Sequence, residues 1–370
     1  MRKHYIDNIR SLCIILVLIY HVFMMYTDII SLGTGSFYPE QPWDAVMYLI
    51  YPWFMLLLFL IAGMCSRYYL DSHTAAEFRK SRTTKLLVPS TIGLFVFGWV
   101  QGYISMSIGG AFEADGGMQA VPLPIKYLIM ALSGTGPLWF IQELWVLSMI
   151  LLLIRKFEKG RLYELCSKAN IIVLLLLAVP VWLSGYVLNM PVITVYRFGI
   201  YTLVFFLGYF VFANDSVIST LEKYCIPLII GAAVLGGAYI ALYFGENFAE
   251  MPVLNSPLAV AFAWVTCLAV LGGMKKWGDR STTVSAFLAK KNWGLYIFHY
   301  LPIALSAYLL RKYTTIPALP CYLITLVTGF CGALLLYETF SRIPFIRWAV
   351  LGIKKAKTPQ NIKGETTNAR

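Results

Sequence analysis

The stretch DNIRSLCIILVLIYHVFMMY, from Asp7 to Tyr26, predicts a membrane-spanning helix that carries two ionisable residues in an apolar run. Arg10 and His21 lie eleven positions apart in it. At about 100° and 1.5 Å per residue, they fall within about 20° of one helix face and roughly 16 Å apart along the axis. Ionisable groups at membrane depth are costly and usually face a bundle interior or a water-filled cavity. We therefore expect Arg10 and His21 to face the same interior region.

The composition is that of a protein that crosses a membrane several times. Of 370 residues, 59% are hydrophobic and 13% are charged, which is about half the charged fraction of a soluble domain. The net charge of +12 is divided among short clusters between apolar runs, as in cytoplasmic loops and unlike a nucleic-acid-binding surface. The seven cysteines show neither CxxC nor zinc-ligand spacing, so the sequence supports no metal site and no disulfide framework.

Apolar segments of about 20 residues predict an all-α integral membrane fold with about ten transmembrane helices in a single bundle. Basic clusters between alternate spans place both the N- and C-termini in the cytoplasm. We expect residues 1–353 to form the membrane domain and 354–370 a polar, basic cytoplasmic tail without fixed structure. The segment 124–133 is short and is expected at the interface. The expected spans are 9–27, 43–65, 86–107, 136–154, 169–188, 197–214, 225–244, 257–273, 292–310 and 319–340.

Two of the four histidines lie inside predicted spans and two lie in polar stretches. His4 and His73 are most simply solvated surface residues. His299 lies about seven residues into the ninth span, roughly 10 Å from its inner end, at a depth that overlaps with that of His21. Each could be a core histidine bonded to a backbone carbonyl. A neutral imidazole in a partly dry cavity also suits general base catalysis on a hydroxyl, because its pKa lies near operating pH.

The sequence leaves two interpretations of Arg10 open. Asp7 lies three residues earlier, so the two side chains can form an ion pair that anchors the start of the first span. Alternatively, Arg10 binds an anionic substrate at the cytoplasmic mouth, because a guanidinium matches phosphate bidentately.

A basic stretch from Arg67 to Lys85 precedes the third span. Arg67, Arg79 and Lys80 are most simply charges that fix the topology. Arg82 and Lys85 are one turn apart where the third helix is expected to begin, and a helix N-terminus favours anions. Arg82 and Lys85 are therefore candidates for holding the phosphates of a cytoplasmic donor.

Acidic residues inside the predicted spans are few. Glu143 follows Trp139 by one helical turn, and Glu338 lies near the inner end of the last span. Each is costly in lipid, so we expect it to face the bundle and to pair with a cation or polar group. A purely structural ion pair and a functional role both remain open for each. Asn292, at the start of the ninth span, is most simply a helix N-cap.

These blocks together resemble the membrane acyltransferase-3 family of bacterial O-acyltransferases. The mark of that family is an arginine, ten residues and a histidine on the first helix, matched by Arg10 and His21. Lys85 stands where the family has a second arginine, which loses the bidentate grip, and Glu338 lacks the proline that usually follows closely. The further similar blocks, in order over about residues 5–350, are Leu58–Gly63, Arg82–Lys85 with Pro89, Leu138–Phe140, Phe205–Tyr209, Tyr296–His299 and Glu338. No stretch looks like the extracytoplasmic domain fused to some members, so the resemblance is to the membrane-only type, including members that modify periplasmic glucans.

The resemblance implies transfer of an acyl group, acetyl first of all, from cytoplasmic acyl-coenzyme A to a hydroxyl of an extracytoplasmic glycan or lipid-linked sugar. The enzyme would lie in the bacterial cytoplasmic membrane as a multi-pass protein. His21 would act as base on the acceptor hydroxyl or as a transient acyl carrier. The resemblance adds Arg10, His299 and Glu338 as further catalytic residues. It implies neither a permanently bound cofactor nor a metal, and the donor would be held by Arg10, Arg82, Lys85 and Trp139.

Two other functions remain compatible with the sequence. One is a polytopic transporter with an intramembrane His/Arg relay. It predicts inverted repeats and matching broken helices, and the sequence shows no such pairing. The other is an acyltransferase that acts on lipid or protein. Transfer of label from acetyl-coenzyme A separates the enzyme from the transporter.

Overall fold

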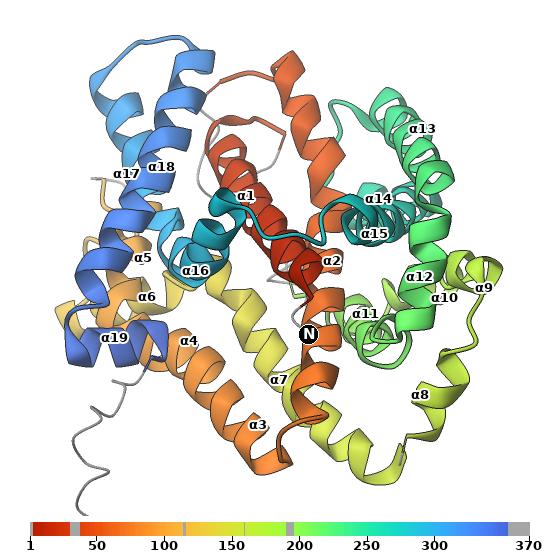
Figure 1. Cartoon of the computed structure of the whole chain (residues 1–370). Helices are drawn as coiled ribbons and strands as arrows, with labels where there is room; N and C mark the ends of the chain where they lie inside the picture. The colour runs from red at the N-terminus through yellow and green to blue at the C-terminus, as the bar shows by residue number, and fades with distance from the viewer. Residues whose placement is uncertain (1–2, 30–37, 114–115, 159, 190–195, 354–370) are drawn as a thin grey trace, which may run out of the picture.

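The computed structural model describes residues 3–29, 38–113, 116–158, 160–189 and 196–353, and these residues fold as helices without a sheet (Figure 1). One isolated antiparallel bridge within these ranges joins Asn189 and Arg197. The α-helices are α1 (His4–Tyr26), α2 (Ala45–Leu70), α3 (Ala75–Arg82), α4 (Val88–Gly93), α5 (Trp99–Ile108), α6 (Leu123–Ser133), α7 (Trp139–Glu158), α8 (Arg161–Cys166), α9 (Ile171–Leu176), α10 (Ala178–Ser184), α11 (Phe198–Leu207), α12 (Asp215–Lys223), α13 (Cys225–Tyr243), α14 (Met251–Leu254), α15 (Pro257–Trp277), α16 (Thr283–Phe298), α17 (Tyr300–Tyr313), α18 (Ala318–Phe340) and α19 (Pro344–Leu351).

The expected all-α membrane fold is confirmed. Seven helices of the described chain are long and apolar enough to cross a membrane, or up to nine if each of two bent helix pairs is one span. The fifth expected span, 169–188, instead contains the short helices α9 and α10, and Ile171–Ser184 is shorter than the helices that qualify. The cytoplasmic placement of both termini stays a prediction, and the tail 354–370 lies outside the described residues. The seven helices are His4–Tyr26, Pro42–Leu70, Ala75–Ile108, Gly136–Glu158, Cys225–Tyr243, Pro257–Trp277 and Ala318–Phe340.

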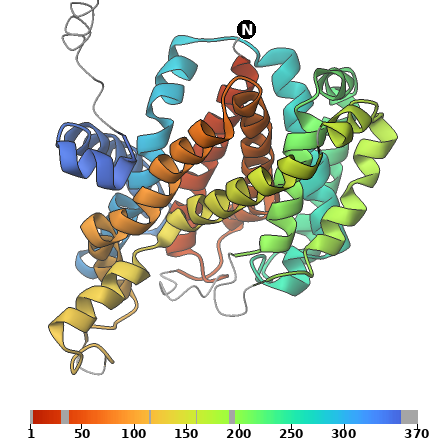
Figure 2. The same cartoon turned by 90° about the horizontal axis from the view of Figure 1, so that it is seen from below.

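Helix α1 forms the centre of the bundle. It contacts α2, α15, α16, α17 and α18, and Figure 2 shows α1 and α2 between α16–α18 on one side and α11–α15 on the other. Ile9, Cys13 and Met25 of α1 are completely buried. Because protein surrounds α1, its ionisable residues face other helices and not lipid.

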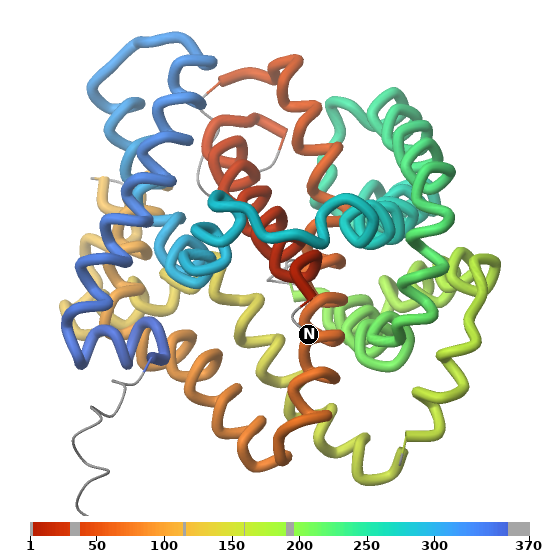
Figure 3. Tube along the Cα trace, in the orientation of Figure 1, coloured from red at the N-terminus to blue at the C-terminus, as the bar shows by residue number. Residues whose placement is uncertain are grey.

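The third membrane helix begins earlier than expected. Thr74 caps it: the Thr74 hydroxyl accepts from the Glu77 backbone N–H, and the Glu77 carboxylate accepts from that of Thr74, a reciprocal capping box. The helix then runs from Ala75 to Ile108 with π-helical turns at Thr83–Leu87 and Leu94–Gly98 (Figure 3). The predicted helix N-terminus at Arg82 is therefore wrong, since that residue lies inside a continuous helix.

Two glycines let α2 and α11 approach backbone to backbone. A Cβ added to Gly63 would lie 2.0 Å from the Phe205 carbonyl oxygen, and one added to Gly208 would lie 2.1 Å from the Leu60 carbonyl oxygen. Small residues allow this close approach between membrane helices. The blocks Leu58–Gly63 and Phe205–Tyr209, which are distant in sequence, are thus the two sides of one helix crossing.

The ninth expected span bends where His299 lies. Helices α16 and α17 meet there at 55°, and Pro302, three residues on, lacks the N–H that an unbroken helix needs to donate to the carbonyl of Phe298. Helix α16 also begins at Thr283, capped by Thr282. The N-cap predicted at Asn292 is therefore wrong: its amide lies mid-helix and donates to the Ser11 hydroxyl at 2.8 Å, tying α16 to α1.

Candidate active site

His21 and His299, predicted at overlapping depths, lie side by side. The Nε2 atom of His299 is 3.1 Å from Nδ1 of His21, and the ring centroids are 4.9 Å apart. His299 is completely buried, whereas His21 is 9% exposed. Of the two, only His21 lines a cavity. His21 therefore lies between His299 and the cavity, and His299 is connected to the cavity by its contact with His21.

Backbone carbonyls determine which nitrogen of each neutral ring carries hydrogen. Nδ1 of His299 lies 2.8 Å from the Tyr296 oxygen, and a carbonyl oxygen can only accept. That Nδ1 is therefore the donor, and Nε2 is left to accept. Nδ1 of His21 lies 2.8 Å from the Val17 oxygen, so its hydrogen is shared between that oxygen and His299. Nε2 of His21 keeps a lone pair.

The cavity beside His21 has a volume of about 350 Å³, within the range of small-ligand sites of about 300–1,000 Å³. It is bounded by α1, α2, the turn Gly136–Leu138 that leads into α7, and the start of α11. Trp139, expected to contact the donor, lies in its wall. Much of the wall is aromatic; besides Trp139 it includes Tyr20, Tyr51, Tyr201, Tyr296 and Tyr300.

Arg10 and Arg82 lie at a second site, nearer the start of α1. Arg10 forms the expected ion pair with Asp7 at 3.2 Å, and its Nη2 donates to Cys65 Sγ at 3.0 Å. Nη2 of Arg82 donates to the hydroxyl of Ser66, the next residue of α2, at 2.9 Å. Two guanidiniums from distant parts of the sequence thus converge on one turn of α2. Neither lines the cavity of His21, which lies about 16 Å along α1 from Arg10.

Lys85 is exposed and is not engaged with this pair. Within the described ranges its ammonium makes no hydrogen bond or ion pair. It lies three residues after Arg82 on the same helix, in the π-helical turn Thr83–Leu87. The structure therefore leaves Lys85 accessible without bringing it to Arg10.

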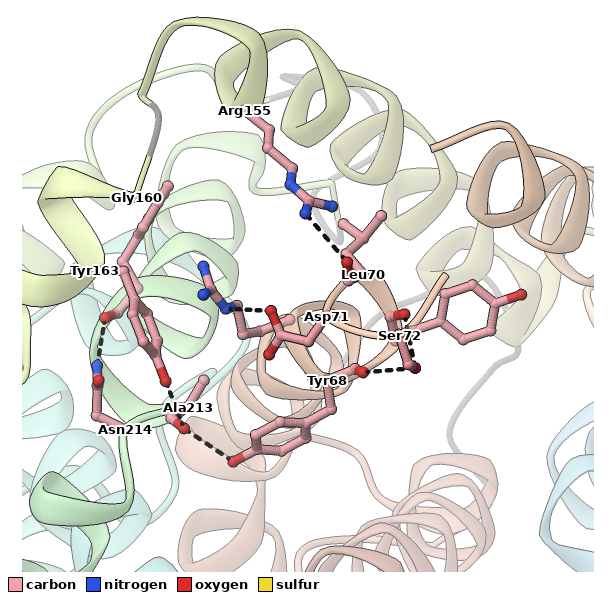
Figure 4. Close-up of polar contacts among 12 residues, drawn as sticks. Tyr68, Leu70, Asp71, Ser72, Arg155, Gly160, Tyr163, Ala213 and Asn214 are labelled. Atoms are coloured by element: carbon pink, nitrogen blue, oxygen red, sulfur yellow. Dashed lines mark hydrogen bonds and ion pairs between the residues drawn. The ribbon is translucent and has the colours of Figure 1, made fainter. Parts of the chain in front are cut away.

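Arg67 of the basic stretch and Arg155 of α7 are engaged in holding the fold together. Arg67 pairs with Asp71 at 3.0 Å and lies 3.8 Å from the centre of the Tyr163 ring. Arg155 donates to the carbonyl of Leu70 at 3.1 Å. Figure 4 shows these contacts fastening the end of α2 to α7 and α8. They support the structural interpretation of Arg67.

Glu338 is not brought to the histidine pair. Its carboxylate forms an ion pair with Lys291 and is half-exposed, so the cation expected to partner it is Lys291. That lysine precedes His299 by eight residues, about 12 Å along α16. Glu338 also does not line the cavity. A catalytic role for Glu338 thus has no geometric support at His21.

Arg197 is a cavity residue that the sequence analysis missed. It lies immediately before α11, is 5% exposed and lines the cavity with His21. Its position at the expected start of a span is typical of an interfacial anchor. A signal was nevertheless present: Arg197 is the one Lys or Arg between Lys168 and Lys223, and it falls on the predicted outer side, where cations are scarce.

The comparisons with known proteins identify the family. Residues 3–338 match the family model described as an acyltransferase domain, Acyl_transf_3. No match was found among curated proteins or among solved structures. The match covers nearly the whole chain, including His21, His299, Arg10 and Arg82. The chain belongs to the acyltransferase-3 family of multi-pass membrane acyltransferases.

Proposed function

We propose that the protein transfers an acyl group, most simply acetyl, from cytoplasmic acyl-coenzyme A to a hydroxyl of an extracytoplasmic glycan or lipid-linked sugar. The bacterial cytoplasmic membrane is the compartment where both substrates are within reach. The observation that carries the proposal is the lone pair of His21 Nε2 on a ring that lines an aromatic cavity. Family membership favours this enzyme over a transporter.

In the proposed reaction His21 acts as general base. Its Nε2 takes the proton of the acceptor hydroxyl while the hydroxyl oxygen forms a bond to the thioester carbonyl carbon. The tetrahedral intermediate then breaks its carbon–sulfur bond. The departing thiolate takes the proton back from His21, giving the ester and free coenzyme A. His299 acts as a positioning residue, because its Nε2 holds the Nδ1–H of His21 and the positive charge that forms on His21 is shared by that hydrogen bond.

Two features support the assignment of the two substrates to the two sites. The aromatic wall of the cavity offers ring faces for a sugar and hydroxyls for hydrogen bonds. The convergent guanidiniums of Arg10 and Arg82 match the phosphates of a coenzyme A donor. A donor bound at the arginines must then extend along α1 to bring its thioester to His21.

We expect His299 to act through a hydrogen-bond acceptor and not through its volume. His299→Leu should lower kcat about 10- to 100-fold, because the Nδ1–H of His21 then loses a partner and the ring is freer to adopt the other tautomer. His299→Gln keeps an acceptor near the same place and should recover part of the loss. Steady-state transfer of labelled acetyl groups measures both. Equal activity of the two variants would contradict the positioning role.

For the donor, Arg10→Ala and Arg82→Ala should each raise KM for acetyl-coenzyme A about tenfold or more, since a hydrogen bond between charged groups contributes about 1.5–3 kcal/mol. Lys85→Ala should have a smaller effect, because a lysine lacks the bidentate fork. Arg79→Ala, which removes an exposed cation one turn before Arg82, serves as the control. If Arg79→Ala raised KM as much as Arg82→Ala, the effect would be general electrostatic attraction and not a phosphate clamp.

The proposal is tested by the fate of the label. Purified protein in lipid nanodiscs is supplied with [14C]acetyl-coenzyme A and an envelope extract, and the glycan, lipid and protein fractions are counted separately. We expect label in the glycan or lipid-linked sugar fraction. Label confined to simple lipid or to protein would replace the proposed acceptor, and absence of any transfer would overturn the proposed donor.

A further inference from the structure

Arg197 brings a permanent charge into the cavity beside His21. Among the described residues that line the cavity, no other lysine or arginine and no carboxylate occurs. Arg197 is held where α11 begins: its backbone bridges to Asn189, and its carbonyl accepts from the N–H of Tyr201. Its position is therefore set by the backbone on two sides.

The guanidinium of Arg197 is oriented but only partly satisfied. Its Nη2 donates to Oδ1 of Asn255 at 3.1 Å, whereas its buried Nε has no partner in the described ranges. Asn255 is fixed in turn by Trp182, whose indole donates to the Asn255 carbonyl at 3.0 Å. A neutral amide thus aims the guanidinium and leaves further N–H donors for another acceptor.

Glu143, the nearby acid, does not supply the missing hydrogen-bond partner of Arg197. Glu143 of α7 is 1% exposed, and neither of its carboxylate oxygens makes a hydrogen bond to a described residue. No ion pair joins Glu143 to Arg197, and Glu143 does not line the cavity. Its charge can balance that of Arg197 only from a distance, and a buried cation needs hydrogen-bonded partners as well as charge balance.

Arg197 faces the cavity from a different wall than His21. Helix α1 packs against α2, α15, α16, α17 and α18, whereas α11 packs against α2, α7 and α10. Hydroxyls of Tyr20, Tyr51 and Tyr201, which bond to none of the described residues, line the same cavity. In this arrangement Arg197 can bind a charged substituent of a sugar ring while a hydroxyl of the same ring lies at His21, the proposed base.

We propose that Arg197 recognises an anionic group on the acceptor, so that the substrate class is acidic sugars carrying a carboxylate or a phosphate. This inference rests on the proposed function for its identification of the acceptor cavity. A guanidinium pairs bidentately with either group, whereas a hydroxyl of a neutral sugar can accept one hydrogen bond from Arg197 but leaves its charge unpaired.

Binding tests this inference independently of turnover. Equilibrium dialysis of the full-length protein in nanodiscs with labelled glucuronate, glucose 1-phosphate and glucose gives three affinities. We expect at least one of the two anionic sugars to bind tenfold or more tightly than glucose. Preference for glucuronate alone identifies a carboxylate, and preference for glucose 1-phosphate alone identifies a phosphate. Equal binding of all three, or binding of none, would overturn the assignment.

Variants assign the preference to Arg197. Arg197→Met should abolish it, and Arg197→Lys should retain part. Asn255→Asp keeps the shape and the arginine but supplies a competing carboxylate, so it should also abolish the preference even if Arg197→Met fails to fold. Arg280→Met removes an exposed arginine outside the cavity and should change nothing. A preference that survives both Arg197→Met and Asn255→Asp would contradict the proposal. Binding of an acidic sugar without acetyl transfer would overturn the proposed function while leaving anion recognition intact.

Discussion

Replacing His21 by glutamine is expected to lower kcat for acetyl transfer by a factor of about 10² to 10⁴, the usual contribution of a general base. Glutamine keeps a polar side chain of similar length but cannot accept and return a proton. The donor site proposed at Arg10 lies about 16 Å away along α1, so KM for acetyl-coenzyme A should change little. Initial rates with labelled acetyl-coenzyme A measure both parameters in detergent-purified protein.

A second measurement separates the base from an acyl carrier. If His21 carried the acyl group, denatured enzyme quenched during turnover would retain label on a peptide containing His21, and His299→Leu would not prevent it. If His21 acts as a base, no such labelled peptide forms. Full activity in His21→Gln would exclude both roles.

The helix crossing at Gly63 is expected to be a position where one added side chain severely harms folding. Gly63→Val should destabilise the protein by more than about 3 kcal/mol, beyond the usual cost of overpacking. The reason is that its Cβ would lie 2.0 Å from a backbone oxygen of α11, and a backbone cannot rotate away as a side chain can. Thermal unfolding monitored by size-exclusion chromatography in detergent measures the loss.

Gly237 provides the matched control for this substitution. It lies within α13, and a Cβ added there would meet nothing within 4 Å. Gly237→Val should therefore have little effect on the unfolding temperature. Equal destabilisation at the two positions would show that the cost comes from helix propensity and not from the crossing.

Much of the fold was predictable because apolar length and helical periodicity are local properties. The first span was expected at 9–27 and is His4–Tyr26. The span expected at 169–188 was not recovered, because the apolar helix there ends at Ser184, short of a spanning length, and hydropathy does not register where a helix ends. The early start of the third helix depends on the capping box of Thr74 and Glu77. This capping box lies in a stretch whose many charges are typical of a loop.

The part of the candidate site that could be predicted consists of residues that are rarely found in apolar membrane helices. His21 and His299 stood out in apolar helices, and the structure brings their rings together. The convergence of Arg10 and Arg82 depends on how α3 packs against α2, which no local pattern encodes. Arg197 was missed because a cation at a span boundary is ordinary until the cavity behind it is known.

The bend between α16 and α17 lies where the wall of the cavity meets the histidine pair, so it can connect ligand binding with proton transfer. Tyr300, the first residue of α17, lies edge-on to His21 and forms part of the cavity wall. His299, next to it, stands at the joint and holds the hydrogen of His21. A ligand that shifts α17 through Tyr300 would also shift His299 and alter the 3.1 Å contact between the histidines. We therefore expect a ligand in the cavity to influence the reactivity of the imidazole pair when its binding shifts α17.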